Sequence, residues 1–132
     1  MAKYDKLTCL VVDDYSTARR IIKNNLHELG FTCLEAEDGE DALGIILQTP
    51  LNLVLVDVKM PNKNGLELLE DIRDDENLKD LPVILTMIEP LDELISTGRE
   101  LGMNDYLIKP FDVFSLAKVL DKVIVTEGGE SL

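Results

Sequence analysis

The chain has 132 residues, 45% hydrophobic and only 5% aromatic, which suits one domain with an aliphatic core. Its 26 acidic and 13 basic side chains give a formal net charge of −13, which disfavours binding to nucleic acids or anionic membranes. The N-terminus lacks the apolar segment of a signal peptide, and no apolar run is long enough to span a bilayer. We therefore expect a cytoplasmic protein.

Apolar strand-like segments alternate with amphipathic helical segments along the chain. The expected strands are Leu7–Val12, Phe31–Ala36, Leu51–Val56, Pro82–Thr86 and Tyr106–Ile108. A helix with apolar residues at helical spacing follows each of them. Ser16 and Asp112 are expected to cap the first and last helices, Gly30 to end the first, and Asp38–Gly39 to open the second.

This alternation predicts a (βα)5 domain of the α/β class, with a parallel sheet and helices on both of its faces. The domain is expected over residues 1–126, and residues 127–132 form a polar tail that should fray. Cys9 and Cys33 fall in expected strands and read as reduced core thiols, whereas His27 reads as a helix-surface residue.

Polar side chains stand where the expected strands end. Asp13 and Asp14 follow the first strand, Asp57 follows the third, Thr86 ends the fourth and Lys109 follows the fifth. Ligands bind at the carboxyl ends of strands in an open parallel sheet, so these groups should converge at one edge. One such residue alone would be weak evidence, but chance convergence of all five is improbable.

The chemistry of this set indicates phosphoryl transfer. Clustered carboxylates repel one another and need a cation, and hard oxygen ligands suit Mg²⁺. Asp57 is then placed to act as a nucleophile and form an aspartyl phosphate. Lys109 can pair with a phosphoryl oxygen and Thr86 can donate a hydrogen bond to another. Positioning and charge stabilisation are what phosphoryl transfer mainly requires.

From Leu7 to about Thr126, the chain resembles a response-regulator receiver domain. The motifs VVDD, LVLVDVKMPNKNG, ILT and YLIKPF match that family's acidic pair, phosphoacceptor loop, switch hydroxyl and lysine-proline pair. The segments STARRIIKNNLHELGF and EAEDGEDAL are similar to chemotaxis regulators of the CheY type. The resemblance implies a flavodoxin-like fold with strand order 2-1-3-4-5.

The resemblance also implies roles for the acidic residues. Asp57 would accept a phosphoryl group from a histidine kinase or a phosphotransfer protein. Asp14, Asp57 and the backbone carbonyl of Lys59 would bind Mg²⁺ directly, and Asp13 would act mainly through a metal-bound water. Such a protein is not an enzyme in the usual sense, because it catalyses only its own phosphorylation and dephosphorylation.

Three further residues would carry the response in this family. Lys109 would contact the phosphoryl group, while Thr86 and Tyr106 would form the switch, the hydroxyl moving toward the phosphoryl group and the ring turning inward. The Lys109–Pro110 bond is cis in some relatives, which the sequence alone does not decide.

The output is expected to be a protein partner bound on the face formed by the fourth helix, fifth strand and fifth helix. Candidates to line that face are Leu91, Leu94, Ile95, Tyr106, Phe111, Lys118 and Lys122. Pro90 is expected at the first turn of the fourth helix, which reaches Leu101, and Gly98 should weaken it, as suits a two-state element. The protein would be a monomer or a phosphorylation-dependent dimer. Chemotaxis is the first expected process and a phosphorelay the second.

Three positions near the acceptor depart from the family pattern. Met87 stands where the family has a small residue, Ile88 where chemotaxis regulators often have a polar one, and Lys59 two residues after the acceptor. We hypothesise that Met87 and Ile88 hinder attack by water and prolong the phosphorylated state. Lys59 would pair with a carboxylate of the site or contact the phosphoryl group. Alternatively, these side chains point to solvent and change little.

Three rival functions share some of these features. A phosphohydrolase with an aspartate nucleophile needs an acid two residues later, where this chain has Lys59. A flavodoxin needs a small, hydroxyl-rich loop after the first strand, where Asp13 and Asp14 would repel a phosphate. A receiver-like scaffold that is never phosphorylated is a more serious rival, although every chemical group for phosphorylation is present.

Overall fold

The computed structural model describes residues 4–124, so the expected polar tail, residues 127–132, lies outside the described residues. The strands are Thr8–Val12 (β1), Thr32–Ala36 (β2), Leu53–Asp57 (β3), Val83–Met87 (β4) and Asp105–Ile108 (β5). The helices are Ser16–Glu28 (α1), Gly39–Gln48 (α2), Gly65–Asp74 (α3), Asp92–Leu101 (α4) and Val113–Val123 (α5). The predicted (βα)5 order is therefore confirmed.

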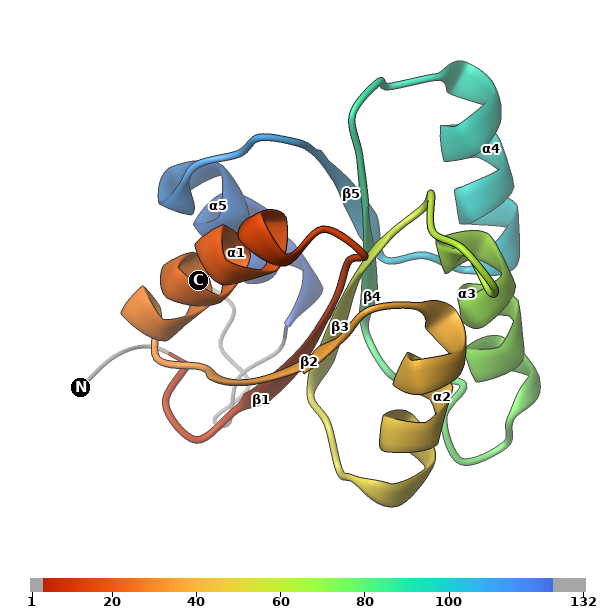
Figure 1. Ribbon diagram of the computed structural model, residues 1–132, viewed down its shortest axis with the longest axis horizontal. Coiled ribbons are helices and arrows are strands. Elements are labelled where there is room, and N and C mark those ends of the chain that lie inside the picture. The colour runs from red at the N-terminus through yellow and green to blue at the C-terminus, as the bar shows by residue number, and fades with distance from the viewer. Residues whose placement is uncertain (1–3, 125–132) are drawn as a thin grey trace.

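All strand pairs are parallel, and the sheet order is β2-β1-β3-β4-β5, as the resemblance implied. Helices α1 and α5 cover one face of the sheet, and α2, α3 and α4 cover the other (Figure 1). On β3, Leu53 and Leu55 belong to the core beneath α1 and α5, whereas Val54 and Val56 belong to the opposite core. Burial on both faces explains why this strand is apolar throughout until Asp57.

The starts of the helices agree with the sequence prediction in two cases and differ in two. Asp38 and Asp112 each accept a hydrogen bond from a backbone N–H in the first turn of α2 and α5, as expected of N-caps. Ser16 instead lies inside α1, whose N-cap is Tyr15 without a capping side-chain bond from any described residue. Pro90 likewise precedes α4, which begins at Asp92.

Gly98 has a packing role that its helix propensity did not reveal. It is the buried residue of α4, and a Cβ atom there would lie 2.7 Å from Met103 Sδ and 3.0 Å from Leu85 Cδ1. The missing side chain therefore allows α4 to approach β4 closely. Helix α4 ends at Leu101 as expected, and Gly102 takes the left-handed conformation that follows it, with φ of 99°.

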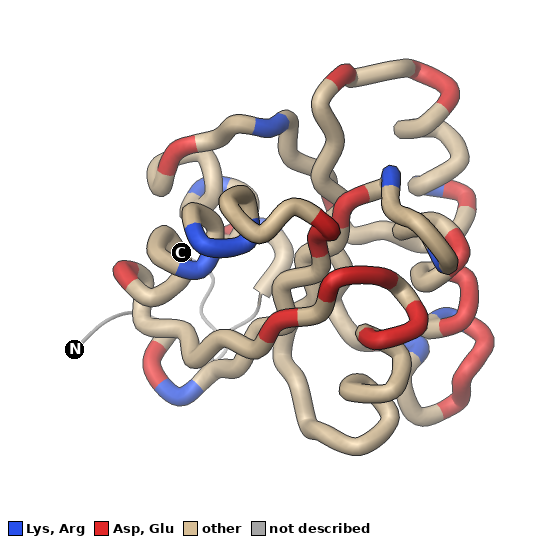
Figure 2. Tube along the Cα trace, viewed as in Figure 1, with Lys and Arg blue, Asp and Glu red and all other residues tan. Residues whose placement is uncertain are grey.

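Charge is unevenly distributed over the two faces. Figure 2 shows Lys and Arg gathered on α1 and α5, while Asp and Glu dominate the outer side formed by α2, α3 and α4. Cys9 and Cys33 lie opposite each other in the β1–β2 pairing as free thiols, and burial raises the pKa of Cys33 to about 11. Both being free agrees with the prediction of reduced core thiols, and His27 is exposed as expected.

Candidate functional site

Buried polar side chains mark one edge of the sheet. Within residues 4–124, the buried polar or charged residues are Asp13, Asp57 and Thr86, all at the carboxyl ends of strands. Asp57 and Thr86 are direct neighbours in the β3–β4 pairing. The convergence predicted from the sequence is therefore present for these residues, in a place where burial is costly unless the groups are compensated.

Lys109 provides that compensation. Its Nζ atom lies 2.8 Å from Asp13 Oδ2 and 2.9 Å from Asp57 Oδ2, so one ammonium bridges two carboxylates from different strands. Burial raises the pKa of Asp57, and the hydrogen bond from Lys109 opposes that effect without cancelling it. For Lys109, burial alone would lower the pKa, but the hydrogen bonds to Asp13 and Asp57 outweigh it and the pKa is raised. The ammonium therefore stays charged at neutral pH.

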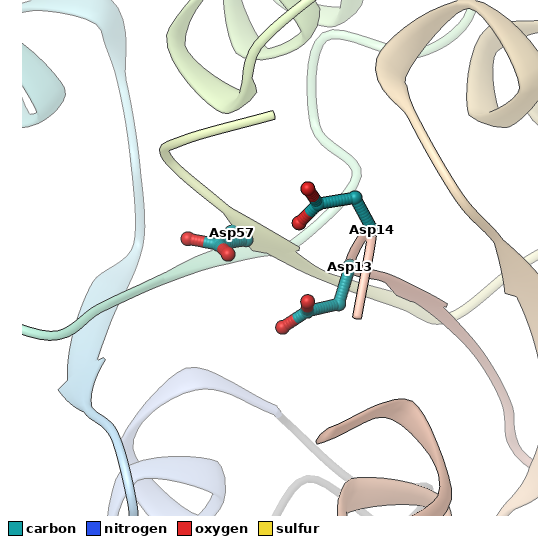
Figure 3. Close-up of side chains that lie close together, drawn as sticks. All are labelled: Asp13, Asp14 and Asp57. Carbon is teal, nitrogen blue, oxygen red and sulfur yellow. The ribbon is translucent and has the colours of Figure 1, made fainter. Parts of the chain in front are cut away.

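Asp14 completes an acidic cluster. Figure 3 shows Asp13 and Asp14, which follow β1, beside Asp57 at the end of β3. Each contributes a carboxylate oxygen, and these oxygens all lie within 4.8 Å of one another. Asp14 is exposed, so the cluster is open to solvent on one side. Several hard oxygen ligands with room for water are the donors that Mg²⁺ prefers, so the residues present fit this ion.

The loop after Asp57 is held by close backbone contacts. The Gly65 N–H donates to the Val58 carbonyl at 3.3 Å, and a Cβ atom at Gly65 would clash with the Asp57 carbonyl oxygen. Gly65 does not have a positive φ, so close packing is the reason why a glycine is needed here. The Asn62 side chain donates to the Asp38 carboxylate at 2.7 Å, which ties the loop to the start of α2.

Lys59 lies in this loop, and its expected pairing with a carboxylate of the site is absent, whereas its contact with a phosphoryl group stays a prediction. The side chain is exposed and makes no ion pair with any described residue, whereas Lys109 pairs with both Asp13 and Asp57. Its backbone N–H instead donates to Asp57 Oδ1 at 3.2 Å.

The two other unusual residues, Met87 and Ile88, differ in their exposure to solvent. Met87 is 1% exposed and packs in the core beneath α2, α3 and α4, so the alternative that it points to solvent is wrong. Ile88 is 72% exposed, in agreement with that alternative.

The expected switch residues lie on two neighbouring strands. Tyr106 on β5 is half-buried and packs against the core beneath α4, with the Arg99 guanidinium 5.8 Å from the centre of its ring. Thr86 lies on β4, beside Leu107 of β5. The Lys109–Pro110 bond is cis.

A shallow groove of about 510 Å³ follows the expected output face, with Tyr106, Phe111 and Lys122 among its lining residues. Among the candidates for that face, Leu91, Lys118 and Lys122 are exposed and the others are half-buried. Lys122 forms an ion pair with Asp105 at 3.0 Å.

One residue that touches the acidic site escaped the sequence analysis. The Arg19 guanidinium on α1 donates to the main-chain carbonyl of Asp13, with 2.6 Å between Nη1 and the oxygen. An arginine in an amphipathic helix reads as a surface residue, so the sequence alone carries no signal for this contact.

Comparisons with known proteins agree with this arrangement. Residues 9–121 match the family described as the response regulator receiver domain. The chain is 44% identical over 115 residues to chemotaxis protein CheY-3 of Vibrio cholerae serotype O1. This match covers 86% of the chain and 88% of that protein. The chain is 40% identical to chemotaxis protein CheY of Pseudomonas aeruginosa, covering 91% and 98% of the two chains. The solved structure of Vibrio cholerae CheY4 superposes with a TM-score of 0.85 at 28% identity, covering 89% and 98%.

Among the described residues, no helix is both long and apolar enough to cross a membrane.

Proposed function

Since the chain belongs to the response regulator receiver domain family, we propose that it accepts a phosphoryl group on Asp57 and signals to a protein partner. The observation that supports this most is the position of Asp57, a buried carboxylate bridged to Asp13 by one ammonium. Burial costs stability, which is reasonable at a site selected for reactivity.

The acidic cluster suits a divalent cation beside the acceptor. Asp14, Asp57 and the Lys59 carbonyl would hold Mg²⁺, and Asp13 would contribute through a bound water. When bound, the ion neutralises charge on the incoming phosphoryl group. The carboxylate of Asp57 then attacks phosphorus, a P–O bond forms and the P–N bond of a donor phosphohistidine breaks, returning the electron pair to the imidazole nitrogen.

Lys109 and Thr86 serve the phosphorylated form in this proposal. Lys109 already lies 2.9 Å from Asp57 Oδ2, so a small movement exchanges a carboxylate contact for a phosphoryl oxygen. The Thr86 hydroxyl would donate to a second oxygen, and the space that it leaves would admit the ring of Tyr106. The response would then reach the face formed by α4, β5 and α5.

The relatives support an inference about the partner and the pathway. A histidine kinase or a phosphotransfer protein would supply the phosphoryl group, and chemotaxis is the process that the names of the relatives favour. Transfer onward in a phosphorelay is the second candidate. A receiver-like scaffold that is not phosphorylated is the third.

Intact-protein mass after incubation with acetyl phosphate tests the proposal. We expect a phosphoryl adduct that requires Mg²⁺ and is absent from the Asp57→Asn variant. An unmodified mass under both conditions, together with no binding of beryllofluoride, would instead support the unphosphorylated scaffold.

The lifetime of that adduct is a separate expectation. Ile88 is exposed in the connection between β4 and α4, and we expect it to hinder the approach of water to the phosphorylated aspartate. Replacing Ile88 by Ala should shorten the lifetime several-fold, measured as loss of the adduct mass with time. Replacing the buried Met87 by Ala tests the other half of the hypothesis, and unchanged decay in both variants would refute it.

A further inference from the structure

We infer that Arg19 is a positioning residue for the cation site, acting through the main chain of Asp13. This inference rests on the proposed function, because it concerns how the acidic cluster is held ready for Mg²⁺. It assigns to Arg19 a task that its place in α1, a helix that contacts β1, β2 and α5, does not suggest.

Asp13 is held from four directions. Its N–H donates to the Ala36 carbonyl at 3.2 Å, and its carbonyl accepts from Arg19 at 2.6 Å. Its Oδ1 accepts from the Tyr15 N–H at 2.9 Å, and its Oδ2 accepts from Lys109 at 2.8 Å. Through the hydrogen bond from Arg19, a charged side chain holds the main chain between β1 and α1.

Among the described residues, no main-chain N–H donates to that carbonyl. Asp13 lies between the end of β1 and the start of α1, and the first helical bond of α1 uses the Tyr15 carbonyl, which accepts from the Arg19 N–H. Side chains on a helix point toward its N-terminus, so the Arg19 guanidinium can reach back past its own first turn. A buried carbonyl without a donor costs free energy, and a charged donor makes a stronger bond than a neutral one.

The guanidinium is itself fixed in place. Its Nε donates to Glu35 Oε1 on β2 at 2.9 Å, and Lys23, one turn later on α1, binds Glu35 Oε2 at 2.7 Å. Only 15% of the Arg19 side chain is exposed. A planar guanidinium can hold the Glu35 carboxylate and the Asp13 carbonyl at once, which the single ammonium of a lysine does less well.

The sign of the effect on cation binding separates positioning from charge. Removing a positive charge near a site for a dication relieves repulsion, so charge alone predicts tighter binding when Arg19 becomes neutral. Loss of positioning predicts weaker binding, because Asp13 and the adjoining Asp14 would have more freedom to lose on binding. The neighbouring Arg20 is exposed and makes no ion pair with a described residue, so it provides a matched charge control.

The experiment measures Mn²⁺ affinity by electron paramagnetic resonance for the wild type, Arg19→Gln, Arg19→Lys and Arg20→Gln, with folding checked by circular dichroism. We expect Arg19→Gln to weaken binding by roughly tenfold, as replacement of residues that orient metal ligands commonly does. Arg20→Gln should leave the affinity unchanged or slightly tighter. Arg19→Lys should fall between Arg19→Gln and the wild type.

Each outcome decides between the alternatives. Equal or tighter binding by a folded Arg19→Gln overturns the role of Arg19 and leaves the cation site intact. If Arg19→Gln does not fold, the comparison of Arg19→Lys with the wild type decides, and equal affinity overturns the inference. Absence of Mn²⁺ binding by the wild type would instead overturn the cation site of the proposed function, and the inference with it.

Discussion

Helices α3 and α4 lie side by side and have ten residues each, but they are held very differently. Asn64 and Glu67 form a capping box at the start of α3, which buries Gly65, Leu68, Leu69 and Ile72. Helix α4 begins after Leu91, with no capping side-chain bond from the described residues, and the residue it buries is Gly98. Helix α3 follows β3, the strand of the proposed acceptor, and α4 follows β4, the strand of the proposed switch hydroxyl.

The difference indicates that α3 gives fixed support and that α4 is the more mobile of the two helices. The proposed acceptor, Asp57, needs a rigid support, which the cap and the buried side chains of α3 supply. A responding element must instead have two arrangements of similar free energy, and few buried contacts favour that. Arg73 of α3 donates to the Gly102 carbonyl at 3.0 Å and to Asn104 at 3.0 Å, so the C-terminal end of α4 is anchored. We therefore expect movement at its N-terminal end.

The largest expected effect tests this contrast in the core. Leu69→Ala on α3 should lower the free energy of unfolding by about 3 kcal/mol, because it leaves a cavity at a fully buried position. Leu94→Ala on α4 should cost about 1 kcal/mol, because Leu94 is only half-buried. Urea unfolding measures both, and equal losses would remove the basis of the comparison.

A second test concerns the junction between the acceptor loop and α3. Gly65→Ala should destabilise the protein by about 2 kcal/mol, because the new Cβ would meet the Asp57 carbonyl. The matched control is Gly44→Ala on α2, where a Cβ has no neighbour within 4 Å. This control should gain about 0.5–1 kcal/mol from helix propensity. A denaturation midpoint of Gly65→Ala that stays unchanged or rises, as that of Gly44→Ala should, would show that Gly65 is not needed for packing.

The sequence predicted the strands and helices better than the caps and side-chain contacts that hold them. Alternation of apolar and amphipathic segments placed every strand to within two residues, and the strand ends identified the acidic site, because both follow from local pattern and parallel topology. The helix caps were less predictable. At the start of α1, the Tyr15 N–H is taken by the Asp13 carboxylate, so Ser16 enters the helix instead of capping it.

Side-chain partners across the sheet could not be read from the sequence. Lys109 was expected to meet a phosphoryl group, but its bridge between Asp13 and Asp57 depends on three strands at once. The guanidinium of Arg19, which contacts Asp13, is also bound by Glu35, and Glu35 belongs to a fourth strand, β2. Gly98 was judged by helix propensity, whereas its neighbours, Leu85 on β4 and Met103 before β5, determine its role. Tertiary contacts of this kind override local preference.

Exchanging the caps gives a smaller and more direct test of the two helix starts. Asn64→Ala should cost about 1 kcal/mol, because α3 loses the side chain that accepts from the Glu67 N–H. Leu91→Asn should gain up to about 1 kcal/mol, because residue 91 already has the extended backbone of an N-cap and lacks a capping side chain. Unfolding free energies decide, and a loss in Leu91→Asn would mean that the half-exposed Leu91 contributes packing that outweighs a cap.

The smallest expected effect lies where α4 meets β5. Arg99, in the last turn of α4, places its guanidinium over the ring of Tyr106, and such a contact contributes about 0.5–1 kcal/mol at an exposed site. A cation near a helix C-terminus also stabilises the helix by itself, and Arg99→Ala removes that effect as well. A double-mutant cycle with Tyr106→Leu separates the two, because only the ring contact depends on both residues. A coupling near 0.5 kcal/mol would assign Arg99 a share in holding the ring of Tyr106, the proposed switch residue, whereas no coupling would mean that Arg99 does not help to hold this ring.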